Sequence, residues 1–172
     1  RVPMPRPEPG LLWGQALAAL KDGDSMLDLC TGSGAIAVAV AVEAAKKKSV
    51  TIVGADISED ALEVARENAR INQASVTFVK ADLFDGIRGK FDLITANPPY
   101  IKSGEIASLD QEVRDFEPRI ALDGGEDGLD FYRRLPERIR RYIRRGGMCI
   151  TECGRGPAPA AIRPFRHPPP CH

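Results

Sequence analysis

Short apolar segments that end in polar or acidic residues recur along this chain, and segments with helical periodicity separate them. Strands are expected over residues 26–30, 50–55, 76–79, 91–96 and 148–153. Helices are expected over residues 11–21, in the alanine-rich run after 34, after 58, and over 129–145 with an interruption or kink at Pro136. This alternation predicts an α/β fold, with a mostly parallel sheet, helices on both faces and ligands at the carboxyl ends of the strands.

The length and the prolines predict one domain with irregular ends. A chain of 172 residues with 43% hydrophobic content suits a single α/β core. We expect a linker remnant over residues 1–10, a catalytic domain over 11–154 and a disordered proline-rich tail over 155–172. No apolar run approaches the roughly 20 residues that cross a bilayer, and no secretory signal is found, so a cytoplasmic protein is expected.

The charges and the metal-ligating residues argue against two classes of function. Lysine plus arginine and aspartate plus glutamate both total 24, which disfavours a nucleic-acid-coating protein. Seven arginines between Arg133 and Arg145 are expected to form a solvated helix face. No metal site is expected, because no recognised ligand spacing is found among Cys149, Cys153, His167, Cys171 and His172.

A glycine turn, Thr31–Gly34, follows the first expected strand and opens a helix. Glycines there allow the backbone to approach a ligand, and the free N–H groups of a helix start favour an anionic group. The string Gly32-x-Gly34-x-x-Ala37 also fits the dinucleotide fingerprint, with Asp56 at about the right distance to hold ribose hydroxyls. The turn alone therefore does not exclude the function of an NAD-linked oxidoreductase.

The tetrapeptide Asn97–Tyr100, with the sequence Asn-Pro-Pro-Tyr, follows the fourth expected strand. It limits the reactions that the site could catalyse. Its prolines leave the carbonyls of Asn97 and Pro98 as outward acceptors, and Asn97 adds a side-chain oxygen. Such acceptors suit a planar NH₂ group held with its lone pair toward an electrophilic methyl group, while Tyr100 offers a stacking face. We predict N-methylation from S-adenosyl-L-methionine, with catalytic residues Asn97, Pro98, Pro99 and Tyr100.

Acidic residues at three strand ends are the candidate cofactor ligands. Asp28 is expected near the methionine part of the cofactor. Asp56 is expected to hold the ribose, with Ile57 as its neighbour in the cofactor site. Asp82 and Leu83 are expected beside the adenine. For Asp56 and Asp82 the alternative is a helix-capping or surface role. The remaining expected cofactor-binding residues belong to the two motifs above: Thr31, Gly32, Gly34 and Asn97.

These motifs together resemble the HemK-type release-factor glutamine methyltransferases over about residues 5–154. The resemblance rests on Pro5-Arg6-Pro7-Glu8, Asp28–Ala37, Asn97–Tyr100, and Glu117-Pro118-Arg119-x-Ala121-Leu122 with Gly124-Gly125-x-Asp127-Gly128-Leu129. The last stretch is the most telling, since other Asn-Pro-Pro-Tyr enzymes do not usually carry it.

The resemblance implies a Rossmann-like class I S-adenosylmethionine-dependent methyltransferase that acts on the glutamine of the Gly-Gly-Gln motif in peptide chain release factors. Its second product is S-adenosyl-L-homocysteine. Asn97 and Pro98 would grip the amide, and Tyr100 would stack on it. The family also has an N-terminal helical domain, absent from this sequence, and C-terminal strands that a chain with the prolines after Gly154 cannot form. A monomer with the release factor as its partner is expected.

Three rival interpretations stay open on the sequence. A nucleic-acid amino-group methyltransferase, acting on adenine, shares the tetrapeptide, although 6% aromatic residues and balanced charge disfavour it. An inactive fragment that binds the cofactor is the second, because of the missing N-terminal domain and the atypical tail. The NAD-linked oxidoreductase is the third, although both histidines lie in the tail, which removes a common acid for hydride transfer.

Overall fold

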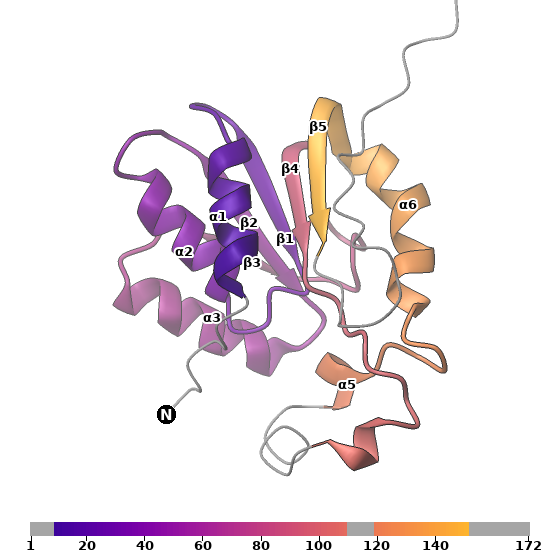
Figure 1. The fold of residues 1–172 in the computed structure, drawn as a ribbon. Coiled ribbons are helices and arrows are strands. Elements are labelled where there is room, and N and C mark those ends of the chain that lie inside the picture. The colour runs from indigo at the N-terminus through magenta and orange to yellow at the C-terminus, as the bar shows by residue number, and fades with distance from the viewer. Residues whose placement is uncertain (1–8, 110–118, 152–172) are drawn as a thin grey trace, which may run out of the picture.

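The computed structural model describes residues 9–109 and 119–151 as a five-stranded sheet between layers of helices (Figure 1). The strands are β1 (Ser25–Leu29), β2 (Thr51–Asp56), β3 (Thr77–Lys80), β4 (Phe91–Ala96) and β5 (Ile143–Thr151). The helices are α1 (Pro9–Ala19), α2 (Ala35–Ala44), α3 (Glu59–Ile71), the short 3₁₀ helix η1 (Ile106–Ser108), α5 (Arg119–Leu122) and α6 (Asp130–Tyr142). All pairings between these strands are parallel, which confirms the predicted α/β class.

The strand order β3-β2-β1-β4-β5 places the first strand at the centre of the sheet. From β1 the chain builds outward through β2 and β3, and then crosses back to add β4 and β5 on the other side. The order therefore reverses between β1 and β4, and their carboxyl ends form the switch point where ligands bind in sheets of this kind. Leu29 pairs with Ala96, so the segments that follow these two strands start side by side.

Two apolar clusters cover the opposite faces of the sheet, because successive side chains of a strand point to opposite sides. The cluster under α1 and α2 includes the buried residues Leu12, Ala16, Met26, Val40 and Ile52. The cluster under α6 includes Leu27, Phe84, Ile94, Leu135 and Ile139. Figure 1 shows α1 and α2 on one side of the sheet and α6 on the other, as the alternation of elements predicts.

Local sequence signals correctly predict α3. Ser58 is its N-cap, and the Ser58 hydroxyl accepts a hydrogen bond from the backbone N–H of Ala61 at 3.3 Å. The predicted buried stripe is confirmed at Leu62, Ala65 and Ala69. Both signals act within one or two helical turns, so the sequence carries them without knowledge of the fold.

The sequence predicts a helix over residues 129–145, but α6 ends earlier, at Tyr142. Ile143 starts β5 by pairing with Phe91 of β4, and its side chain is 1% exposed. Arg144 and Arg145 follow on the strand, whereas the run of arginines suggested a continuing helix face. β5 accordingly begins at residue 143 rather than 148, and α6 is not interrupted at Pro136.

Two other regions differ from expectation, and β1, β2 and β3 are each displaced by one residue. The region expected to be one long polar loop up to about Gly125 contains η1 and α5. Helix α1 begins at Pro9, two residues before the expected start at 11, because proline is compatible with the first turn of a helix. Glu117, Pro118 and the expected proline-rich tail lie outside the described residues.

The described residues contain no group of three or more His, Cys, Asp or Glu side chains that could hold a metal ion. Of the five candidate metal ligands in the sequence, Cys149 alone is described, and it packs in the cluster under α6. Burial raises the pKa of the Cys149 thiol to about 12, so the thiol stays protonated. None of the described helices has the length and hydropathy to cross a membrane.

Candidate active site

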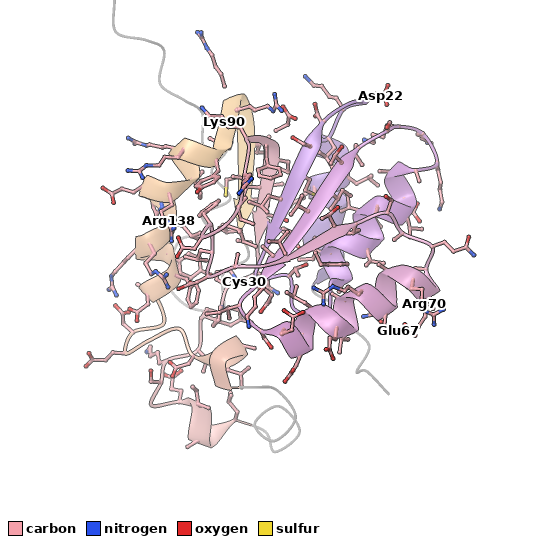
Figure 2. The ribbon with its side chains drawn as sticks, turned by 180° about the vertical axis from the view of Figure 1, so that it is seen from behind. Asp22, Cys30, Glu67, Arg70, Lys90 and Arg138 are labelled. Carbon is pink, nitrogen blue, oxygen red and sulfur yellow. The ribbon has the colours of Figure 1, made fainter. Side chains whose placement is uncertain are left out.

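The glycine turn joins the end of β1 to the start of α2. Gly32 and Gly34 adopt φ of 54° and 76°, which glycine reaches without steric cost. Gly34 is the N-cap of α2, and a Cβ there would lie 3.0 Å from the Ala65 Cβ. A Cβ built on Gly32 would meet nothing within 4 Å, so the turn faces open space at Gly32. In Figure 2 the labelled Cys30, which precedes the turn, lies where the strands end.

The buried carboxylate of Asp28 holds this turn in place from the protein interior. Asp28 is 0% exposed, and its two oxygens accept hydrogen bonds from the hydroxyls of Thr31 and Thr95, both at 2.6 Å. Burial raises the pKa of Asp28 from 3.8 to about 6, although the two hydroxyl hydrogen bonds oppose that shift. The carboxylate therefore ties the glycine turn to strand β4, two residues before the tetrapeptide.

Thr95 is a site residue that the sequence reasoning missed. It stands directly opposite Asp28 in the β1–β4 pairing and is itself 0% exposed. The signal available in the sequence was a hydroxyl residue between the apolar residues Ile94 and Ala96. Its meaning depends on the register between β1 and β4, which a single sequence does not supply.

Asp56, at the end of β2, orients the same turn from the side. One carboxylate oxygen accepts the backbone N–H of Gly32 at 2.8 Å, and the other accepts the N–H of Ser58 at 2.9 Å. Each oxygen keeps a further lone pair for a ligand, since an ionised carboxylate offers about four acceptor positions. Ile57 follows and is 43% exposed, so a large apolar side chain stands beside this carboxylate.

Asp82 and Leu83 follow β3 but are held differently. The Asp82 carboxylate accepts hydrogen bonds from Arg134 of α6 at 3.0 and 3.1 Å. Leu83 adopts φ of 55° while its side chain is buried in the cluster under α6. Cys30, before the glycine turn, has the same unusual φ of 55°. Left-handed non-glycine residues thus occur after two of the strands at this edge, and such strain is commonly retained at functional sites.

The tetrapeptide leaves the end of β4 beside the glycine turn. Asn97 is half-buried, and Pro98 and Pro99 are buried. Tyr100 is 41% exposed, so part of its ring remains accessible to a ligand. The β1–β4 pairing brings this group next to the glycine turn. Within the turn, the Thr31 hydroxyl donates to Asp28 and the Gly32 N–H donates to Asp56, so these four residues form one cluster. Asp82 and Leu83 follow β3 at the same edge, and two strands, β2 and β1, lie between β3 and β4.

The methyltransferase small domain family matches residues 12–114, which include the glycine turn, the three acidic strand ends and the tetrapeptide. The chain belongs to this family. The solved structure of a ribosomal protein L11 methylase from Lactobacillus delbrueckii subsp. bulgaricus covers 86% of this chain and 61% of its own, with a TM-score of 0.59 and 21% identity. That likeness supports the Rossmann-like methyltransferase fold predicted from the sequence.

Curated relatives are more similar in sequence. The release factor glutamine methyltransferase of Thermodesulfovibrio yellowstonii is 43% identical over 165 residues, which is 92% of this chain and 58% of that protein. The ribosomal protein uL3 glutamine methyltransferase of Francisella tularensis subsp. tularensis is 41% identical over 138 residues, 78% of this chain and 43% of that protein. The chain thus spans about half the length of these curated relatives.

Proposed function

We propose that this chain transfers the methyl group of S-adenosyl-L-methionine to the side-chain amide of the glutamine in the Gly-Gly-Gln motif of peptide chain release factors. The observation that carries the proposal is the pairing of Leu29 with Ala96, because it sets a cofactor-type glycine turn beside a tetrapeptide rich in acceptors. Similarity to release factor glutamine methyltransferases over 92% of the chain supports the choice of substrate.

The cofactor suits the groups at this edge. The open space at Gly32 and the N–H groups at the start of α2 suit the carboxylate of its methionine part. Asp56 has acceptor positions for the two ribose hydroxyls, and exposed Ile57 can cover the sugar. The sequence predicts Asp28 and Thr31 as cofactor ligands, but Asp28 is 0% exposed and accepts hydrogen bonds from Thr31 and Thr95, so we assign both residues to fixing the shape of the turn. When bound, S-adenosyl-L-methionine supplies an electrophilic methyl group on a sulfonium.

The adenine side of the site is proposed to lie at Asp82 and Leu83. The side chain of Leu83 packs in the core, so its backbone rather than its side chain would face the adenine. Asp82 has its carboxylate oriented by Arg134, with lone pairs remaining for an amino group. S-adenosyl-L-homocysteine would leave from the same residues after transfer.

The tetrapeptide residues act on the substrate amide. The side-chain oxygen of Asn97 and the carbonyl of Pro98 would accept its two N–H groups, which directs the nitrogen lone pair toward the methyl group. Pro99 keeps this backbone rigid, and the exposed part of the Tyr100 ring would stack on the planar amide. Orientation rather than a strong base is the main contribution, since the sulfonium leaving group is already activated. As the N–C bond forms and the S–C bond breaks, the amide nitrogen would release one proton to solvent by way of its hydrogen bond to the Asn97 side-chain oxygen.

The proposal extends to the whole enzyme. Its catalytic domain is proposed to extend from α1, which begins at Pro9 rather than at the expected residue 11, to residue 154. It works as a monomer in the cytoplasm, with the release factor as its partner and without nucleic acid. A second candidate substrate is the glutamine of ribosomal protein uL3, because a uL3 glutamine methyltransferase is 41% identical to this chain.

The test is transfer of labelled methyl groups from S-adenosyl-L-methionine to separate acceptors. The acceptors are a release factor, the same protein with its Gly-Gly-Gln glutamine replaced, ribosomal protein uL3 and duplex DNA. Label on the intact release factor alone is expected. Label on uL3 would support the second candidate, and label on DNA would support the nucleic-acid methyltransferase. Cofactor binding without label on any acceptor would identify an inactive cofactor-binding fragment.

A further inference from the structure

Residues 122–128, here called the glycine segment, run beside the chain as it leaves the tetrapeptide. The N–H of Ile101 donates to the carbonyl of Leu122 at 3.1 Å, and the N–H of Gly124 donates to the carbonyl of Ile101 at 2.8 Å. The N–H of Ser103 donates to the carbonyl of Gly125 at 2.9 Å. A short parallel bridge between Ile101 and Asp123 results. The exit of the tetrapeptide is therefore held by a second piece of backbone.

Two glycines of this segment touch the tetrapeptide backbone where no side chain fits. A Cβ on Gly124 would lie 2.8 Å from the Tyr100 Cα and 2.9 Å from the Pro99 carbonyl oxygen. A Cβ on Gly128 would collide with the carbonyl oxygen of Tyr100, and Gly128 also has φ of 79°. Real Cβ contacts do not approach backbone so closely, so alanine at either position must displace the tetrapeptide or the segment.

The glycine segment is itself anchored on both sides. One oxygen of Asp123 accepts the Ser103 hydroxyl at 2.5 Å and the Gly125 N–H at 3.0 Å. The N–H of Asp130, the first residue of α6, donates to the carbonyl of Gly124 at 3.0 Å. The segment thus connects the start of α6 to the backbone of Tyr100, and a shift of the segment would be passed to the tetrapeptide.

We propose that the glycine segment is a positioning element, in which the contacts of Gly124 and Gly128 with Pro99 and Tyr100 set the tetrapeptide acceptors and the Tyr100 ring against the substrate amide. Its effect on the rate rests on the proposed function. The glycines are required because backbone passes within contact distance of backbone at both positions. A misplacement of about 1 Å in such groups can cost about 100-fold in rate.

The test compares Gly128→Ala with Gly146→Ala in the same chain. Both glycines have φ of 79°, but a Cβ on Gly146 meets nothing within 4 Å, so the pair shares the backbone strain and differs in the collision. Gly128→Ala is expected to lower kcat on the release factor at least about tenfold relative to Gly146→Ala, with KM and cofactor affinity within about threefold. Amide hydrogen exchange at Ile101 is expected to become faster only in Gly128→Ala.

Equal kcat and equal Ile101 exchange in the two variants would overturn the proposal, and so would loss of cofactor binding in Gly128→Ala alone. If Gly128→Ala does not fold, Gly124→Ala takes its place, with Gly104→Ala as control because a Cβ there meets nothing within 4 Å. If the parent chain transfers no methyl group to a release factor, the proposed function fails. The Ile101 exchange rates then still support or overturn the positioning contact, because they require no substrate.

Discussion

The two regions that meet at the switch point are held in different ways. The glycine turn rests on side chains from three neighbouring elements: Asp28 of β1, Asp56 of β2, and Asn68 of α3, whose amide donates to the Ser33 carbonyl at 2.9 Å. The tetrapeptide has prolines, and its exit is held by backbone hydrogen bonds from the glycine segment.

The difference follows from what each region has to offer a ligand. A turn whose shape is fixed by the buried carboxylate of Asp28 and the half-buried carboxylate of Asp56 can present N–H groups to one unchanging cofactor. A substrate site must keep the acceptors of its backbone and side chain for the ligand. The tetrapeptide is therefore supported by contacts with glycines of the glycine segment, which have no side chain. We therefore expect the first region to determine cofactor affinity and the second to determine methyl transfer.

The largest effect is expected for Asn97→Ala, which removes the side-chain acceptor of the tetrapeptide. Methyl transfer should fall by about 100- to 1000-fold, as it does when a single transition-state hydrogen bond is lost. Cofactor affinity, measured by calorimetry, should change by less than about threefold, since the glycine turn is intact. Asn72→Ala, at the exposed end of α3, serves as the control. Loss of cofactor binding in Asn97→Ala would contradict the division between the regions.

The converse change is Asp56→Ala. It removes the acceptor for the ribose and the partner of the Gly32 N–H, so cofactor affinity should fall by about 30- to 100-fold, or about 2–3 kcal/mol. At saturating cofactor, kcat should stay within about threefold of the parent value. Asp60→Ala, in the exposed first turn of α3, should leave both quantities unchanged. A large loss of kcat with normal affinity would reverse the assignment.

A smaller effect is expected on the pH dependence of stability through Asp28. Its folded pKa of about 6 exceeds the usual 3.8, so the folded state binds more protons between these values. This contribution is therefore fully present below pH 3.8 and is lost as the pH rises through 6. From pH 7 to pH 5 the group should add about 1 kcal/mol to the free energy of unfolding of the parent relative to Asp28→Asn.

Urea unfolding at both pH values measures this difference. Asp60→Asn, which removes an exposed carboxylate in place of the buried one, is the matched control variant. If the free energy of unfolding of Asp28→Asn changed with pH as much as that of the parent, Asp28 would not titrate as a buried carboxyl.

The smallest effect is expected for Arg134→Ala. The Arg134 and Asp82 side chains are 44% and 43% exposed, so solvent and salt screen their ion pair. The free energy of unfolding should change by about 0.5 kcal/mol, with less effect at high salt. Thermal unfolding at two ionic strengths would check this, beside Arg141→Ala as an exposed control. A loss above about 2 kcal/mol would mean that the pair organises the adenine side of the sheet.

Features that depend on near neighbours could be predicted from the sequence. The Ser58 cap, the buried stripe of α3 and the end of β4 before the tetrapeptide each follow from residues within a few positions. The α/β class and the placement of the motifs at strand ends followed from the alternation of these elements.

Features that depend on pairing between distant segments could not. The hydrogen bond between Thr95 and Asp28 requires the β1–β4 register. The start of β5 at Ile143 requires the pairing of Ile143 with Phe91. The glycines of residues 122–128 were useful as part of a motif, but their physical reason is the backbone of Pro99 and Tyr100 about two dozen residues earlier in the chain. A single sequence carries no direct signal for such contacts.

The most direct test of the account is to locate the transferred methyl group. A release factor is incubated with the chain and isotope-labelled S-adenosyl-L-methionine, and the modified peptide is sequenced by mass spectrometry. The account predicts the label on the side-chain nitrogen of the Gly-Gly-Gln glutamine, and its loss with Asn97→Ala. Label on another residue type, or undiminished label with Asn97→Ala, would contradict the claim that the tetrapeptide presents a planar amide to the cofactor.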